Sequence, residues 1–248
     1  MKKAVRLTAV FLAAALLGAC AVNENGERND PLEKVNRVMW DFNYNVMDPY
    51  LLEPAAKVWR NYVPTPVSSG LANVANNLDE PVSFVSRLLE GEPRKAFVHF
   101  NRFWINTIFG LGGLIDVAGR SEPLQIDAQR GLGETLGTYG IDPGAYVMLP
   151  VYNATTPRQL TGAAGDAGMM YPFWNWVGGP WSLVKYGVQA VDGRAKALDK
   201  TELLRQAQDP YITFREAYYQ NLAFKVNNGK TEESPQKRLS DDVLKEID

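Results

Sequence analysis

The sequence predicts an all-α protein with a single domain over residues 30–226. Three Asp-Pro pairs indicate helix starts, because an aspartate side chain caps the first N–H groups and proline suits the first helical position. These pairs are Asp30-Pro31, Asp48-Pro49 and Asp209-Pro210. Apolar residues recur every three or four positions along most of the chain, and neither an internal repeat nor a linker divides it.

The first two predicted helices follow Asp30 and Asp48. Asp30 and Glu33 also have the spacing of a capping box, which favours a helix that begins there. The apolar positions of the first helix share one face: Leu32, Val35, Val38, Met39, Phe42 and Val46. Those of the second helix are Leu51, Leu52, Ala55, Val58 and Trp59.

Three further helices are predicted over residues 65–78, 81–89 and 93–109. Thr65-Pro66 opens the first of these, and Gly91 ends the second. The third is apolar on nearly all sides, with Phe97, Phe100, Phe103, Trp104, Ile105 and Ile108. A helix of this kind lies either at the centre of a protein or against lipid.

Glycine is frequent from Gly110 to Gly144, and we expect loops there. The apolar segment 145–152 follows Pro143-Gly144 and is predicted to form an extended loop or a hairpin. The remaining predicted helices cover residues 181–198, a short stretch capped by Asp199, and residues 210–226. Residues 227–248 are polar and charged, which is typical of a flexible tail.

The N-terminus has the pattern of a lipoprotein signal peptide over residues 1–19. A basic stretch precedes an apolar run that is too short to span a membrane, and the run ends in Leu17-Gly18-Ala19-Cys20. This is a lipobox, in which the Cys20 thiol takes the lipid and small side chains give the peptidase access to the backbone. Cys20 is the only cysteine of the chain. We therefore predict lipid attachment at Cys20, followed by a linker over residues 20–29. No aspartate follows the cysteine as an inner-membrane retention signal, so the outer membrane is favoured.

The segment 171–181 holds three of the six tryptophans, Trp174, Trp176 and Trp181. Gly178-Gly179-Pro180 interrupts it, so it is a poor candidate for a core helix. The three indoles form either part of the core or a belt at a membrane interface, where indole rings lie at the level of the lipid headgroups. We predict the interface.

Several classes of function are disfavoured by composition. The net charge of −2 argues against nucleic acid, because binding to phosphates needs a basic face. Gly131, Gly133 and Gly137 have a dinucleotide-like spacing, but the polar residues before them do not resemble a buried strand. A single histidine, His99, with no second cysteine cannot form a zinc site. No metal or cofactor is expected, and His99 is predicted to be structural.

A series of short motifs in collinear order over residues 30–225 resembles the MlaA family, also called VacJ-like lipoproteins. The first motifs are Asp30-Pro31-Leu32-Glu33, Asp48-Pro49-Tyr50 and Asn77-Leu78-Asp79-Glu80-Pro81. The later ones are Gly110-Leu111-Gly112-Gly113, Tyr146-Val147-Met148-Leu149-Pro150 and Asp209-Pro210-Tyr211.

The resemblance implies an all-α ring that lies in one leaflet of the outer membrane, lipid-anchored on the periplasmic face. A central amphipathic channel passes through such a ring. Its partners would be phospholipid, trimeric porins of the OmpC or OmpF type, and a soluble periplasmic lipid carrier of the MlaC type. The implied function is removal of misplaced phospholipid from the outer leaflet, which keeps the two leaflets different, and it involves no catalysis.

The glycine-rich segment is predicted to gate this channel. Glycine reaches positive φ without steric cost, so a loop with Gly131, Gly133, Gly137, Gly140 and Gly144 is able to hinge. Tyr146, Met148 and Leu149 then give the loop an apolar part to place in a lipid path. A static glycine-rich turn is the alternative, and the family resemblance favours gating.

Two other functions stay open from the residues. One is a membrane-anchored hydrolase of lipid or cell wall, suggested only by scattered serine and aspartate residues and His99. The other is a purely structural lipoprotein whose helices pack on other outer-membrane proteins.

Overall fold

The computed structural model describes residues 30–126 and 128–230. The predicted signal peptide, Cys20, the linker as far as residue 29 and the tail from residue 231 lie outside these residues. The predicted start of the tail, 227–230, forms a turn at the end of the last helix.

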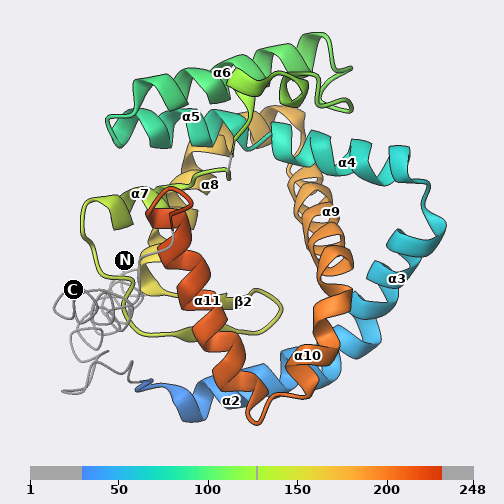
Figure 1. Ribbon diagram of the computed structural model, residues 1–248, viewed down its shortest axis with the longest axis vertical. Coiled ribbons are helices and arrows are strands. Elements are labelled where there is room, and N and C mark those ends of the chain that lie inside the picture. Colours follow the sequence, from blue (N-terminus) through green and yellow to red (C-terminus); the bar gives the residue numbers. More distant parts are fainter. Residues whose placement is uncertain (1–29, 127, 231–248) are drawn as a thin grey trace, which may run out of the picture.

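The helices form a ring, and the prediction of an all-α ring-shaped domain is confirmed (Figure 1). One side of the ring consists of α2 (Glu33–Phe42), η2 (Asn43–Leu52), α3 (Glu53–Tyr62) and α4 (Thr65–Asn77). The antiparallel pair α5 (Glu80–Leu89) and α6 (Pro93–Ile108) follows, and then the short α7 (Leu132–Thr138). The long helices α8 (Pro157–Val177), α9 (Pro180–Ala197) and α11 (Pro210–Val226) complete it, with α10 (Thr201–Arg205) before the last. Short 3-10 turns are η3 (Ala118–Arg120), η4 (Glu122–Leu124) and η5 (Leu198–Lys200).

The apolar segment 145–152 forms part of a small β-hairpin, as one of the two sequence interpretations predicted. Strand β1 (Val147–Leu149) pairs antiparallel with β2 (Asn153–Thr155), with Met148 opposite Ala154. Two asparagines of the first helical segment hold the hairpin. Asn36 donates its amide N–H to the Tyr146 carbonyl (2.9 Å) and accepts from the Met148 N–H (2.9 Å). Asn43 likewise donates to the Leu149 carbonyl and accepts from the Val151 N–H, both at 2.8 Å.

The predicted helix start at Asp48-Pro49 is wrong. Helix runs without a break from Glu33 to Tyr62, and Pro49 lies inside the π-helical segment η2. Proline lacks an N–H and crowds the carbonyl four residues earlier, and the wider π turn accommodates both effects. Asp209 does cap α11, where it accepts from the N–H groups of Tyr211 (3.0 Å) and Ile212 (3.2 Å).

Two helices lie where the sequence predicts none. Helix α8 begins at Pro157, has Thr156 as its cap and includes Pro172. Its glycines and this proline interrupt the apolar period by which a helix is predicted from sequence. Helix α7 occupies part of the glycine-rich segment that we expected to be loop. The two helices touch through glycine, because a Cβ on Gly162 would lie only 2.1 Å from the Gly133 nitrogen.

The ring buries many polar residues and exposes many apolar ones, which is the reverse of most soluble proteins. A compact apolar core does exist around Trp40, Tyr146, Met148, Tyr211 and Tyr219. Elsewhere polar residues are buried, and among the described residues they outnumber the buried apolar ones. Helix α6 shows the inversion clearly, since it buries His99, Arg102 and Asn106. On the same helix Phe97, Phe100, Trp104 and Ile108 are exposed. No helix within the described ranges is both long and apolar enough to cross a membrane.

Candidate functional site

A cavity of about 730 Å³ lies between η2, the hairpin tip, α9, α10 and α11. Most of its wall is apolar and comes from elements far apart in the sequence. The apolar wall includes Trp40, Met47, Leu51, Leu52, Val151, Ala190, Leu204, Phe214 and Ala217. A space of this size and character is in the usual range for sites that hold small apolar ligands.

Polar residues occupy one region of the cavity wall. Arg194 on α9 forms a bidentate ion pair with Asp48, with Nε–Oδ1 at 2.6 Å and Nη2–Oδ2 at 2.8 Å. Hydrogen bonding to Asp48 raises the pKa of Arg194 above its ordinary value. Arg194 also donates to the Thr201 hydroxyl (2.9 Å), and exposed Lys200 adjoins this pair in the wall. The cavity therefore has an apolar body and a polar region in which Asp48 balances the charge of Arg194.

The structure divides the predicted gating residues into two groups. Tyr146 and Met148 are buried at 1% and 2% exposure in the apolar core, while Leu149 is half-buried at the end of β1. Their main-chain groups are bound by Asn36 and Asn43. The hairpin tip beyond them reaches the cavity through Val151, Tyr152 and Asn153. No finding tests gating, which stays a prediction.

The predicted hinge glycines serve different purposes. Gly131, Gly133 and Gly137 have neighbours so close that a Cβ would meet Asp166, Gln159 or Val226 at under 3 Å. These three are needed for packing around α7. Only Gly140 (φ +78°) and Gly144 (φ +79°) adopt the left-handed conformation that glycine favours. We expected all five glycines to use their conformational freedom, and two of them do.

The N-terminus of α7 is capped by a carboxylate from α8. Asp166 accepts a hydrogen bond from the Leu132 N–H (3.0 Å), and Glu134 accepts from the Gly131 N–H (3.0 Å). Burial raises the pKa of Asp166 to about 6, and the nearby carboxylates of Glu134 and Asp79 add to this effect. Lys185, which pairs with Asp79 at 2.5 Å, opposes it.

His99 belongs to a buried polar network between α5 and α6. Its Nδ1 lies 2.6 Å from Oε2 of Glu80, and the other Glu80 oxygen accepts from Arg102 Nε at 2.8 Å. Arg102 continues the network to Asp116, which also accepts from Asn106 (2.9 Å). Glu80 and His99 are each 1% exposed, so this network links helices and presents no accessible histidine.

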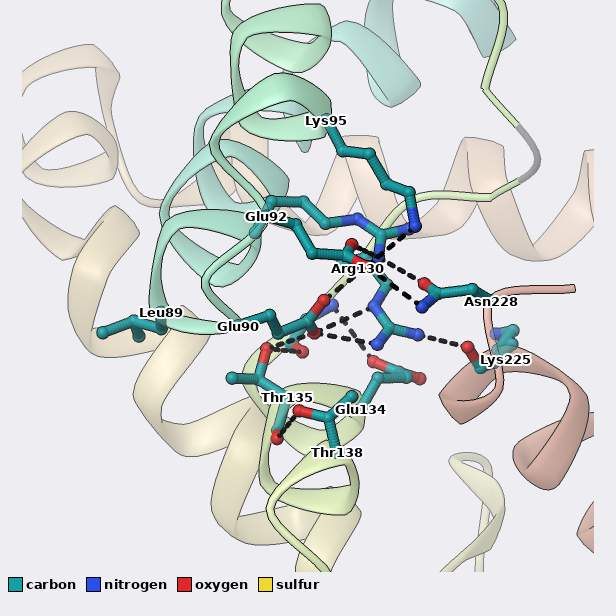
Figure 2. Close-up of polar contacts among 12 residues, drawn as sticks. Leu89, Glu90, Glu92, Lys95, Arg130, Glu134, Thr135, Thr138, Lys225 and Asn228 are labelled. Carbon is teal, nitrogen blue, oxygen red and sulfur yellow. Dashed lines mark hydrogen bonds and ion pairs between the residues drawn. The ribbon is translucent and has the colours of Figure 1, made fainter.

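A second buried network, the ring-closing cluster of Arg87, Glu90, Glu92, Arg130 and Asn228, joins α11 to α5 and α7. Figure 2 shows Arg130 between Glu90 and the end of α11, where it donates to the Lys225 carbonyl. Arg130 Nε binds Glu90 Oε1 at 3.0 Å, and Arg87 binds Glu92 at 2.7 Å and the Asn228 side chain. Arginine at a helix C-terminus stabilises the last carbonyl groups. This cluster fixes the C-terminal end of α11 to α5 and to the start of α7.

The three predicted interfacial tryptophans lie on either side of the α8–α9 turn. Trp176 is 83% exposed and Trp181 is 60% exposed, whereas Trp174 is half-buried. Gly178 forms the turn with φ +110°. Indoles this exposed are not core residues. Whether they lie at a membrane interface stays a prediction.

Sequence reasoning missed the cavity and the ring-closing cluster. Both combine residues that are far apart in the chain, such as Arg87 with Asn228, so no local motif indicates them. A weak signal existed in the frequent glycines, which allow close helix contacts but do not specify partners.

Comparison with known families decides the classification. The family described as MlaA lipoprotein matches residues 28–225, which is most of the chain. This chain belongs to the MlaA family. The resemblance stated from the sequence motifs is thereby confirmed. The family is one of lipoproteins, which agrees with the lipobox, although Cys20 itself lies outside the matched and described residues.

Individual relatives agree over the whole length. The chain is 71% identical to the intermembrane phospholipid transport system lipoprotein MlaA of Haemophilus influenzae, over 100% of both chains. It is 45% identical to the MlaA of Escherichia coli K12, over 98% of each. A solved structure from work on the structural basis for maintenance of bacterial outer membrane lipid asymmetry is also similar. It has a TM-score of 0.74 and 47% identity, and the match covers 80% of this chain and 100% of that one.

Proposed function

We propose that this protein is an outer-membrane lipoprotein that removes misplaced phospholipid from the outer leaflet and passes it through the ring towards the periplasm. The single observation that supports this best is the inverted ring, with apolar side chains exposed on its helices and an apolar cavity between them. The relatives named for intermembrane phospholipid transport support the same substrate class.

The exposed apolar residues support a position in one leaflet. Exposed side chains such as Phe109, Trp176 and Leu183 would be costly in water, at about 25 cal/mol for each Å² of apolar surface. Lipid removes that cost. Because the described helices are too short or too polar to span a bilayer, contact with lipid would occur around the ring rather than along one crossing helix.

The cavity supports passage of a molecule with two parts. Its apolar wall suits acyl chains, and the region of Lys200, Thr201 and the Arg194–Asp48 pair suits a polar headgroup. No group of metal-ligating side chains occurs within residues 30–126 and 128–230, and the proposed transport requires none.

Gating belongs to the proposal, with the hairpin tip as the moving part. Val151 has φ +68°, a conformation that a β-branched residue adopts only when its surroundings enforce it. Asn43 provides that enforcement through its bond to the Val151 N–H. A strained tip beside the cavity is able to exchange between two arrangements of similar free energy.

Disulfide trapping tests the gate. The hairpin tip is bound to η2 by the hydrogen bond between the Val151 N–H and Asn43, so a cysteine at the tip should be paired with one in η2. We expect the closed disulfide to stop lipid transport and a reducing agent to restore it. Transport that continues in the oxidised protein would contradict gating.

The geometry gives the hydrolase alternative no support. His99 is buried against Glu80, and no catalytic serine arrangement involves it in the described network. Mass spectrometry of lipid that co-purifies with the mature protein distinguishes lipid transport from a purely structural role. Phospholipid should co-purify if the proposal holds.

Complementation tests the function directly. A strain that lacks its own MlaA lipoprotein should expose phosphatidylethanolamine at its surface, where an impermeant amine reagent labels it. We expect this chain to restore low labelling, and Cys20→Ala to lose both fatty-acid incorporation and restoration. If the lipidated chain reaches the outer membrane and labelling stays high, the proposal is wrong. Co-purification assays with trimeric porins and the periplasmic carrier test the proposed partners.

A further inference from the structure

The segment that follows α6, residues 109–115, exposes many apolar side chains over a short length. We call it the apolar loop. It lies at the end of α6, beside α4 and on the outer side of the ring (Figure 1). Its four large side chains are all exposed: Phe109 (71%), Leu111 (69%), Leu114 (43%) and Ile115 (39%). Exposed apolar side chains that gather in this way mark a contact with lipid or with another protein.

Leu111 has a backbone conformation that leucine rarely adopts. Its φ is +54°, in the left-handed region where a Cβ is crowded by the following carbonyl oxygen. The conformation costs free energy, and the exposed side chain gains no packing within the described residues to offset it. Water would add a further cost for the apolar surface, whereas surrounding hydrocarbon would remove that cost.

The main chain of the apolar loop is hydrogen-bonded within the protein. The N–H groups of residues 112 and 113 donate to carbonyls in the last turn of α6, at 3.0 and 2.9 Å. The Ile115 N–H donates to the Gly110 carbonyl (2.9 Å), and Asn73 of α4 donates its side-chain N–H to the Leu114 carbonyl (3.2 Å). Lipid offers no partners to backbone groups, so non-helical backbone near it needs internal partners of this kind.

The composition of the apolar loop favours the acyl chains over the headgroups. Its residues are Phe, Leu, Ile and Gly, without the tryptophan and tyrosine that prefer the level of the headgroups. The turn between α8 and α9 has that other composition, with Trp176 and Trp181 exposed. The sequence has no charged residue over 103–115, and this stretch is shorter than the roughly 20 residues that cross a bilayer. Contact would therefore be with one leaflet.

We propose that the apolar loop inserts its side chains among the acyl chains of one leaflet and fixes the depth of this edge of the ring. The partner is thus a lipid surface and not a second protein. The proposal rests on the membrane position proposed above and adds a defined point of contact to it. Apolar faces at a membrane surface typically lie about 5–10 Å into the boundary between headgroups and acyl chains, and we expect the same depth here.

A fluorescent dye on the apolar loop measures this depth. Lipid attachment at Cys20 blocks its thiol, so an introduced cysteine is the only one that the dye labels. The experiment uses the mature lipoprotein, one copy per nanodisc of phosphatidylethanolamine and phosphatidylglycerol, with the dye on Leu111→Cys. We expect lipid with a nitroxide on its acyl chain to quench the dye and aqueous iodide to have little effect. Phe109→Cys provides the same measurement at a second position if Leu111→Cys does not fold.

Gln208→Cys is the matched control, because Gln208 is exposed in the polar turn between α10 and α11. Its dye should be quenched by iodide and little by the nitroxide lipid. A dye on the apolar loop that iodide quenches as strongly as the one at Gln208 would overturn the proposal. A dye shielded from both quenchers would overturn it too, because the loop would then be covered by protein.

Leu111→Asn separates contact with lipid from folding. Asparagine adopts positive φ more readily than leucine, so the melting temperature in detergent should not fall. The dye on Phe109→Cys should nevertheless lose quenching by the nitroxide lipid and gain quenching by iodide, because the loop has lost an apolar side chain. Unchanged quenching in this variant would contradict the role of Leu111.

The outcomes distinguish this proposal from the proposed function. If the apolar loop lies in water while the unlabelled wild-type chain restores lipid asymmetry in cells, the lipid contact is wrong and the function stands. If the loop lies among the acyl chains while that chain fails to restore asymmetry, the lipid contact stands and the function is wrong.

Discussion

His99 illustrates how a residue that looks chemically interesting has a structural role. The sequence predicted a structural role for it, and it is indeed buried. Its actual neighbours are Glu80 and, through Glu80, Arg102. Sequence alone could not identify Glu80 as the partner, because Glu80 lies on another helix and its spacing from His99 follows no local pattern.

We expect His99→Gln to fold and to keep function, because an amide retains a polar group facing Glu80. His99→Leu leaves a buried carboxylate oxygen without this partner, so it should lower the free energy of unfolding by about 1–3 kcal/mol. Chemical denaturation in detergent measures both variants. Equal stability of the two would show that the Glu80 contact contributes nothing.

Asp166 predicts a pH dependence with a definite sign. Its pKa is about 6 in the folded protein and near 3.9 in an unfolded chain, so the folded state binds the proton more tightly. The stability due to this group is complete below about pH 4 and is lost as the pH rises through about 6. The groups that face Asp166 are the N–H of Leu132, which it caps, and the side chains of Glu134, Asp79 and Lys185.

Asp166→Asn should therefore be more stable than wild type at pH 7.5, by on the order of 1–2 kcal/mol. The difference should shrink at pH 5, since the wild-type carboxyl is then largely protonated. Melting temperatures at the two pH values provide the measurement, with the exposed Asp41→Asn as control. A variant that is less stable than wild type at pH 7.5 would contradict the sign.

At the scale of elements, the sequence predicted the helices that begin with clear caps or have one apolar face. Asp209 and the apolar pattern of residues 65–109 gave correct elements. Helix α8 was missed because its inner face is made of glycines, which serve close packing and leave no apolar period. The π-helical segment around Pro49 was missed because proline normally marks a boundary, and only the tertiary contacts of Asp48 and Asn43 favour a continuous helix there.

The contact between α7 and α8 predicts opposite effects for two similar substitutions in α8. Gly162→Ala places a methyl group 2.1 Å from the Gly133 nitrogen, and backbone atoms cannot yield cheaply, so a loss of about 1–3 kcal/mol is expected. Gly168→Ala meets open space and should stabilise the helix by about 0.5–1 kcal/mol. Denaturant unfolding of both variants tests this, and a neutral Gly162→Ala would mean that the helices separate easily.

At the scale of the whole molecule, the ring is held by buried polar networks and exposes much of its apolar surface. The family resemblance predicted the ring, whereas composition alone predicted only a helical domain. Hydrophobic and charged fractions of 46% and 22% are ordinary. The exposure of apolar residues and the burial of polar ones therefore result from the orientation of the side chains and not from the composition. For this reason the cavity and the ring-closing cluster could not be predicted before the helices were placed.

The exposed turn between α8 and α9 gives a prediction about orientation in the membrane. Fluorescence of Trp176 and Trp181 should be quenched by brominated phospholipid, and Trp176→Phe with Trp181→Phe should remove most of that quenching. Substitution at such exposed positions should change stability by less than about 0.5 kcal/mol. Quenching by aqueous iodide alone would place this turn in water.

The contacts that close the ring join residues that are very far apart along the chain. The hydrogen bond between Tyr211 and Asp30 spans 181 positions, and that between Arg87 and Asn228 spans 141. Both ends of α11 are fixed in this way, and contacts of long sequence separation form late in folding. A chain that emerges N-terminus first therefore makes these two contacts only after the last helix has arrived. Any quality control that acts before that moment meets a protein in which Asp30 and Arg87 still lack these two partners.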